Sequence, residues 1–160
     1  SKTFNLAGLQ TSNIFVPNEA LRRKLEEFLK RGSANPKCNI LGYKACEIAY
    51  SSCGEWLDEC IQVIDENRRV ITEFMAENFP QIRVCELQAT YLLWMDWNGL
   101  GLDYKELERI NRQEAGLFFD EGYIFGAQGE GFERWNLACP TSYVVAALKR
   151  MKEAYGKYVK

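Results

Sequence analysis

The sequence predicts an α+β fold, with helices along most of the first half of the chain and strands mixed with helices along the second. Two observations carry this prediction. Apolar residues recur at helical spacing up to Phe79, and beyond Pro80 short strand-like runs alternate with helical stretches. The chain has 160 residues, which is enough for one large domain or for a domain and part of another.

The first half is predicted to form one strand and three helices. β-branched and apolar residues before Pro17 favour the strand, and Asn18 is placed to cap the first helix. Pro80 ends the third helix, because proline cannot continue one. The predicted bounds are 10–16 for the strand and 18–32, 40–54 and 55–79 for the helices.

The second half is predicted to form a compact α+β unit. Residues 90–97 are so apolar that we expect both faces of this strand to be covered. Asp103 and Glu106 have the spacing of a capping box, and Pro140 with Thr141 opens the last helix. The predicted strands are 82–87, 90–97, 117–119, 122–125 and 133–138, with a helix at 104–115. The inward positions of the last helix are predicted to be Val144, Val145, Leu148 and Met151.

The third predicted helix is long enough to connect two domains. At a rise of about 1.5 Å per residue, a helix of this length would span roughly 37 Å. We place the domain boundary within it and expect one domain to end near residue 70. The predicted domains are therefore 1–70 and 71–160.

Composition and charge exclude several classes of protein. The 20 basic residues nearly balance the 22 acidic ones, which argues against a nucleic-acid partner, and no apolar run near 18 residues predicts a membrane span. Histidine is absent, so Ser-His-Asp and Cys-His catalysis are excluded from this stretch. The cysteines form no CxxC pair, so we expect no metal site and a cytoplasmic location with free thiols. These cysteines are Cys38, Cys46, Cys53, Cys60, Cys85 and Cys139.

Lys2 is the first candidate catalytic residue. A lysine near a terminus is usually a solvated charge, so its neighbours decide its interpretation. The run SKTFNLAGL at residues 1–9 resembles the lysine loop of the class I and II aminotransferase family, whose members are fold-type-I enzymes. The resemblance implies that Lys2 binds pyridoxal 5'-phosphate (PLP) as a Schiff base and moves the substrate Cα proton. A primary amine is suited to both tasks.

Gln10 departs from the wider family pattern. Many relatives have an arginine eight residues beyond the lysine that pairs with the cofactor phosphate, whereas an amide offers only neutral hydrogen bonds. The run AGLQTSN at residues 7–13 and the following IFVPN are similar to the MalY/PatB branch, which includes cystathionine β-lyases and cysteine desulfhydrases. The departure therefore indicates a subgroup.

Arg134 is the second candidate site residue. The run FGAQGEGFERWNLA at residues 125–138 resembles the family's glycine-rich loop and the strand that follows it, and residues 89–96 resemble a strand of its small domain. The resemblance implies that Arg134 binds the substrate α-carboxylate, which a planar guanidinium can orient through two parallel hydrogen bonds. Asn136 is expected to be structural. Cys139, Tyr43 and Tyr91 are expected to be packing residues.

The resemblance covers the whole sequence but only the carboxyl-terminal half of a family member. It implies the end of the PLP-binding large domain followed by a small α+β domain, in a homodimer. It also implies a β C–S lyase acting on amino acids of the cystathionine or cysteine type. An amino-acid aminotransferase would use the same residues and remains an alternative. A third hypothesis is an inactive fragment that serves only in folding or dimerisation.

Overall fold

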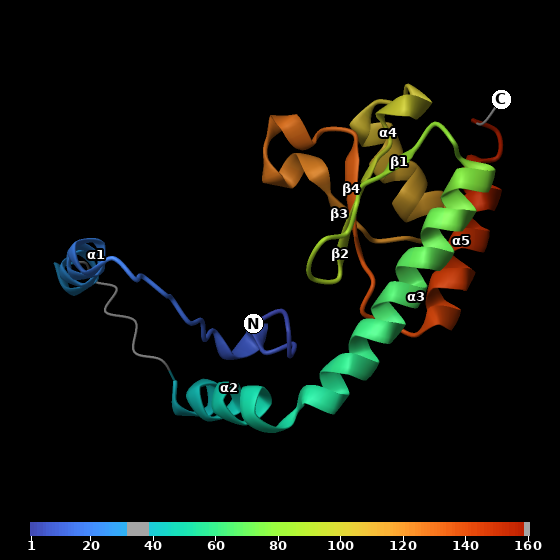
Figure 1. Cartoon of the computed structure of the whole chain (residues 1–160). Helices are drawn as coiled ribbons and strands as arrows, with labels where there is room; N and C mark the ends of the chain where they lie inside the picture. The colour runs from blue at the N-terminus through green and yellow to red at the C-terminus, as the bar shows by residue number, and fades with distance from the viewer. Residues whose placement is uncertain (32–38, 159–160) are drawn as a thin grey trace. The chain divides into compact units, whose positions relative to one another are not determined.

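The computed structural model describes residues 1–31 and 39–158, so Gly32 and Cys38 lie outside the described residues (Figure 1). The chain divides into two compact units, Ser1–Leu57 and Asp58–Lys160. Helix α3 (Gly54–Asn78) begins in the first unit and continues into the second. The observed elements make the chain α+β, as predicted.

The first unit contains the short 3₁₀ turn η1 (Ala7–Leu9) and the helices α1 (Glu19–Arg31) and α2 (Ile40–Ser52). The predicted Asn18 cap is confirmed, since its Oδ1 accepts a hydrogen bond from the Leu21 amide at 3.0 Å. The predicted strand at 10–16 is wrong. This segment is irregular, and the described part of the unit contains no strand with which it could form a ladder.

Few side chains of the first unit are buried. Among its described residues only Gly42 and Ala49 are buried, and no residue of α1 is. Phe15 and Phe28 are 88% and 75% exposed. The apolar spacing that predicts α1 therefore describes a helix whose apolar side chains stay accessible to solvent in this chain.

The second unit is built on an antiparallel sheet with strand order β1-β2-β4-β3. The strands are β1 (Arg83–Val84), β2 (Leu92–Asp96), β3 (Asp120–Glu121) and β4 (Phe132–Asn136). Arg134 of β4 lies opposite Trp94 of β2 and opposite Asp120 of β3. The register thus gives Arg134 a neighbour on each side.

The predicted strands at 117–119 and 122–125 are wrong, although a strand lies between them. Residues 120–121 form β3, and the chain then turns through the 3₁₀ helices η4 (Gly122–Phe125) and η5 (Ala127–Gly129). A Cβ added at Gly122 would overlap the carbonyl oxygen of Gly129, so the two turns pack backbone against backbone. Residues 122–125 therefore form a turn that packs closely on the next one, and not the expected extended strand.

The predicted helix at 104–115 has two parts. Helix α4 (Tyr104–Arg109) begins at Asp103, whose Oδ1 accepts from the Lys105 amide at 2.9 Å, and it continues as the π-helical turn η3 (Ile110–Glu114). Glu106 does not complete a capping box. Its carboxylate pairs with Arg109 instead, at 2.7 Å.

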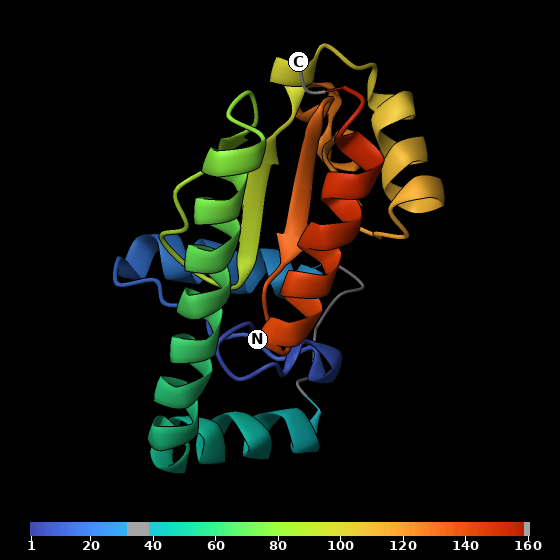
Figure 2. The ribbon, with the colours of Figure 1, turned by 90° about the vertical axis from the view of Figure 1, so that its right-hand side faces the viewer.

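One face of the sheet carries the core. Figures 1 and 2 show α3 and α5 (Thr141–Tyr155) side by side over this face, where Leu93 and Met95 of β2 are fully buried. The opposite face of β2 is half-buried, so the expectation that both faces are covered holds for one face only within this chain. Val145 is 53% exposed and not inward as predicted, because its neighbour Val144 occupies the buried position. The other core residues from the two helices are Ile71, Met75, Ala147, Leu148, Met151, Ala154 and Tyr155.

Asn67 is a fully buried polar residue in the middle of α3. Its Nδ2 donates to the carbonyl oxygens of Leu137 and Cys139, at 2.9 and 2.8 Å. These carbonyls belong to the segment that connects β4 to α5. One amide group therefore joins this connection to α3 through hydrogen bonds to two backbone carbonyls.

Glu133 is a second buried polar residue, and it is 1% exposed. It lies on the core-facing side of β4, directly across from Glu121 of β3. Glu121 pairs with Arg112 at 2.6 Å. Burial, and then the negative charge of Glu121, raise the pKa of Glu133 to about 8. At neutral pH the folded chain therefore favours the protonated form of Glu133.

Replacing Glu133 with glutamine is expected to remove a pH dependence from the stability of the second unit. The unfolded chain releases this proton near the ordinary pKa of 4.5, whereas the folded chain keeps it up to about pH 8. The protonated group stabilises fully below pH 4.5, and this contribution is lost as the pH rises toward 8, by about 1.4 kcal/mol per pH unit. The measurement is urea unfolding at several pH values, followed by tryptophan fluorescence.

The exposed Glu130 provides the matched control, since Glu130→Gln makes the same chemical change outside the core. This control is expected to keep the wild-type pH dependence. A Glu133→Gln variant whose free energy of unfolding falls with pH as steeply as that of the wild type would contradict the buried-acid account.

Candidate functional site

Lys2 lies in a tight turn at the start of the chain. The Leu6 amide donates to the Ser1 carbonyl at 2.9 Å, and the Asn5 amide donates to the Lys2 carbonyl at 3.3 Å. Asn5 has φ 52°, a left-handed conformation that asparagine tolerates better than most residues. Lys2 is exposed, so its side chain is accessible at the surface of the first unit.

Phe4 anchors this turn to the helices of the first unit. Its ring meets that of Tyr50 from α2 edge to face, with centroids 5.0 Å apart, and stacks on Trp56 from the first turns of α3 at 6.3 Å. Such pairs add to the stabilisation from apolar burial. The position of Lys2 is therefore set by an aromatic residue two places along the chain.

A second anchor holds the end of the loop at the start of α2. Asn39 caps α2 by accepting from the Gly42 amide at 2.7 Å, and its Nδ2 donates to the Leu9 carbonyl at 2.6 Å. Gly42 is buried, and a Cβ there would overlap the Thr11 hydroxyl. Sequence reasoning missed both residues. The type and position of Asn39 could have indicated its capping role, because asparagine favours helix N-caps and Asn39 directly precedes the helix predicted at 40–54.

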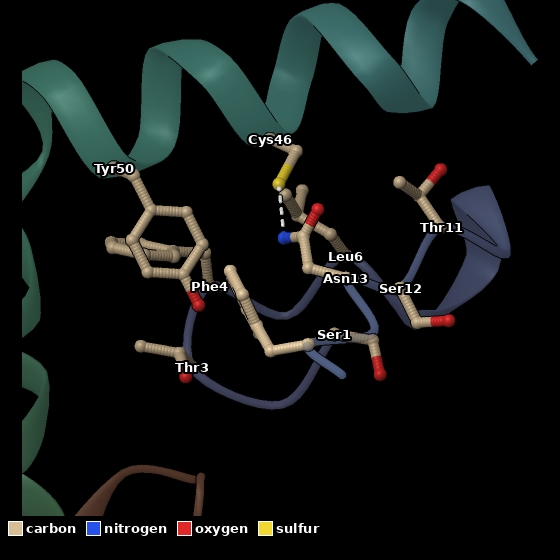
Figure 3. A pocket seen from close by; sticks show the side chains of 10 residues that line it. Ser1, Thr3, Phe4, Leu6, Thr11, Ser12, Asn13, Cys46 and Tyr50 are labelled. Atoms are coloured by element: carbon tan, nitrogen blue, oxygen red, sulfur yellow. Dashed lines mark hydrogen bonds between the residues drawn. The ribbon is translucent and has the colours of Figure 1, made fainter. Parts of the chain in front are cut away.

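A cavity of about 380 Å³ lies beside the lysine loop (Figure 3). Ser1 and Thr3, the two neighbours of Lys2, both line it, although Lys2 itself does not. Asn13 crosses it, with Nδ2 donating to Cys46 Sγ at 3.4 Å. The lining residues are Ser1, Thr3, Phe4, Leu6, Thr11, Ser12, Asn13, Phe15, Cys46 and Tyr50.

The cavity lining offers neutral hydrogen-bond partners. Five hydroxyl groups and one amide contribute to it, and none of the ten lining side chains is charged. Gln10, where many relatives have arginine, is exposed and adopts φ 51°. Its backbone amide donates to the Ala7 carbonyl at 3.0 Å. The described residues therefore suit a polar group with an accessible amine nearby. None of the lining side chains is a cation that could pair with a phosphate.

Arg134 lies in the second unit, on the sheet face opposite the core. Its Nε and Nη2 both donate to Asp120 Oδ2, at 3.0 and 2.7 Å. Its guanidinium carbon lies 4.5 Å from the centre of the Phe125 ring. Trp94, its cross-strand neighbour, meets Phe125 edge to face at 5.3 Å. An acid and an aromatic group thus hold the guanidinium of Arg134.

The remaining candidates have structural surroundings. Asn136 Oδ1 accepts from the Ala138 amide at 2.9 Å. Burial raises the pKa of the Cys139 thiol, which disfavours the reactive thiolate. Tyr43 is 62% exposed and does not line the cavity, so the expectation that it is a packing residue is wrong within this chain. In the described part of the chain, no helix is long and apolar enough to cross a bilayer, and no three potential metal-ligating side chains are grouped together.

The sequence profile of the family described as aminotransferase class I and II matches residues 1–151. The chain belongs to this family. Cystathionine beta-lyase PatB of Bacillus subtilis (strain 168) is 35% identical over 154 residues, which are 96% of this chain and 40% of PatB. Protein MalY of Escherichia coli (strain K12) is 29% identical and covers 89% of this chain, with 36% of MalY covered.

Solved structures of this family confirm the fold. The structure of cystalysin from Treponema denticola, which contains PLP, superposes with a TM-score of 0.87 at 43% identity, covering 97% of this chain and 39% of cystalysin. The PLP-bound C-S lyase from Staphylococcus hominis, with an inhibitor, gives a TM-score of 0.81 at 27% identity and covers 99% of this chain and 41% of the lyase. The chain is a member of the MalY/PatB branch that spans about 40% of the length of these relatives.

Replacing Gly42 with alanine is expected to displace the loop that follows Lys2. The added Cβ would overlap the Thr11 hydroxyl, which must move, and it would lie 3.0 Å from the Leu9 carbonyl oxygen, to which that hydroxyl donates at 3.2 Å. Loss of the hydrogen bond from the Thr11 hydroxyl to the Leu9 carbonyl costs about 1 kcal/mol. A loss of this size corresponds to several-fold faster local opening of the loop. The measurement is hydrogen exchange of the Leu9 and Gln10 amides, which close η1.

The matched control is Gly54→Ala, because a Cβ at Gly54 meets nothing within 4 Å and this residue is also helical. Exchange at residues 9 and 10 is expected to be unchanged in this control. Equal exchange in the two alanine variants would show that the loop does not depend on close contact at Gly42.

Proposed function

We propose that the protein is a PLP-dependent β C–S lyase that acts on amino acids of the cystathionine or cysteine type. Homology to PatB and cystalysin across nearly the whole chain carries the proposal. Lys2 is proposed as the catalytic lysine that binds the cofactor as a Schiff base, and Arg134 as the group that binds the substrate carboxylate. The accessible Lys2 turn and the guanidinium held at Asp120 support these two assignments.

Lys2 is suited to be the amine that this chain supplies to the cofactor site. An amine must reach the aldehyde of PLP, and Lys2 is exposed on a turn fixed by the Phe4 contacts. When bound, PLP supplies the electron sink for a carbanion at the substrate Cα. Lys2 Nζ would then take the Cα proton as a general base. Expulsion of the β-thiol, followed by hydrolysis with one water, yields pyruvate, ammonia and a thiol.

Arg134 would orient the substrate. Two hydrogen bonds from a guanidinium fix a carboxylate in a plane, and so fix the direction of the Cα–H bond relative to the group that removes the proton. A lysine at this position would supply charge without the angle. The proposed domain assignment follows the family, with 1–70 as the end of the large domain and 71–160 as the small domain. A homodimer in the cytoplasm is the expected form.

Two alternatives rest on particular observations. An amino-acid aminotransferase is favoured by the family profile itself, which describes that activity, and it would use the same two residues. An inactive fragment that acts only in folding or dimerisation is favoured by the chain's share of its relatives' length and by the few buried residues of the first unit. The following experiments separate the three.

The whole protein is expected to release pyruvate and a thiol from L-cystathionine. Lys2→Ala should lower kcat by about 10²- to 10⁴-fold, because no other group on the loop replaces the amine as a general base. Coupled lactate dehydrogenase reports pyruvate, and a thiol reagent reports the sulfur product. Clean amino-group exchange with a keto acid, without thiol release, would establish the aminotransferase alternative.

Addition of PLP to the isolated chain is expected to give weak or no lysine-dependent yellow absorbance. No charged side chain lines the cavity beside the loop, so affinity for the cofactor phosphate should be low. Spectra of wild type and Lys2→Ala provide the comparison, with borohydride reduction and mass mapping to locate any modified lysine. A stable yellow complex that requires Lys2 would overturn the inactive-fragment alternative.

A further inference from the structure

We propose that Asp120 is a positioning residue for the substrate carboxylate, acting through Arg134. This inference rests on the proposed function of Arg134 and extends it to a second residue that sequence reasoning did not identify. Asp120 would not touch the substrate. It would fix which edge of the guanidinium is presented to the carboxylate.

The hydrogen bonds define that edge. Nε and Nη2 of Arg134 both point to one oxygen of Asp120, at 3.0 and 2.7 Å. Within the described residues, Arg134 Nη1 has no hydrogen-bond partner, and Nη2 retains a second hydrogen. The outer edge formed by Nη1 and Nη2 is therefore the one available for two parallel hydrogen bonds to a second carboxylate.

The guanidinium plane is restrained by aromatic rings as well. Phe125 lies 4.5 Å from the guanidinium carbon, and Trp94 meets Phe125 edge to face at 5.3 Å. Phe132 also meets Trp94, at 6.3 Å. Asp120 and Phe125 restrain different movements, since the acid fixes rotation within the plane and the ring opposes tilting out of it.

The sheet is constructed so that Asp120 lies beside Arg134. Strand β3 has only two residues, and both pair with β4. Glu121 lies opposite the buried Glu133, while Asp120 lies opposite Arg134 on the other face. Because the side chains of a strand alternate between faces, the same short strand serves the core with one acid and the Arg134 face with the other.

The pair contributes orientation more than stability. The side chains of Arg134 and Asp120 are 23% and 45% exposed, and ion pairs at such positions stabilise a fold little. Asp120 also repels a second carboxylate, but the repulsion is weakened by solvent, and Asp120 occupies the edge away from the one proposed for substrate. We therefore expect the gain from orientation to exceed the repulsion.

The test is a double-mutant cycle in the whole protein with L-cystathionine as substrate. Asp120→Asn keeps an acceptor but removes the charge, and it is expected to raise KM about ten-fold with a smaller effect on kcat. Arg134→Lys is expected to raise KM further. In the Arg134→Lys background, Asp120→Asn should have little additional effect, because the group on which it acts is gone.

Asp65→Asn is the matched control, since Asp65 also pairs with an arginine, Arg68 at 2.8 Å, on the exposed surface of α3. Its KM should equal that of the wild type. An unchanged or lower KM in Asp120→Asn would overturn the positioning role of Asp120. The same effect of Asp120→Asn in the wild-type and Arg134→Lys backgrounds would overturn it as well. Neither result would contradict the carboxylate-binding role of Arg134. If Arg134→Lys leaves KM unchanged, both the carboxylate role of Arg134 and the role of Asp120 are refuted.

A second readout does not depend on activity. In the isolated chain, NMR of arginine Nε–H groups measures how fast the Arg134 proton exchanges with water. Asp120→Asn should accelerate this exchange several-fold, and Asp65→Asn should not change it. Unchanged exchange in Asp120→Asn would contradict the claim that Asp120 fixes the orientation of the Arg134 guanidinium. Accelerated exchange in this variant of the isolated chain, together with a whole protein that has neither lyase nor aminotransferase activity, would refute the proposed function alone.

Discussion

The second unit depends on the two hydrogen bonds that Asn67 donates to the carbonyls of Leu137 and Cys139. They join the middle of α3 to the segment that leaves β4 and enters α5. The apolar contacts of α3 and α5 with the sheet are not directional, whereas these two bonds set one register between the helix and the connection. The strand that presents Arg134 is positioned by the same arrangement.

The sequence predicts the helices well and the short strands poorly. Helices α1, α2 and α3 lie within a few residues of their expected bounds, and α5 begins where predicted, because caps such as Asn18 and breakers such as Pro80 act locally. Strand formation depends on a partner elsewhere in the chain. Residues 10–16 include the β-branched or apolar Thr11, Ile14, Phe15 and Val16, yet the segment is irregular, since no strand is present beside it in the described part of the first unit.

The candidate site is predictable where one local motif contains it. Lys2 and Arg134 each stand within a run that resembles a family motif, and the family assignment made from those runs is confirmed. Gly42 and Asp120 were missed because their roles arise from contacts with Leu9 and Arg134, which are 33 and 14 residues away. Such contacts depend on a register and a packing distance that sequence spacing does not contain.

The exposed apolar side chains of the first unit affect how the isolated chain associates in solution. Phe15, Phe28, Ile40 and Leu41 are each more than two thirds exposed, and exposed large apolar side chains favour association between molecules. The net charge of −2 supplies little repulsion between molecules. The colloidal behaviour of the isolated chain should therefore be governed by its first 57 residues, so that concentration and salt set how much of it remains monomeric.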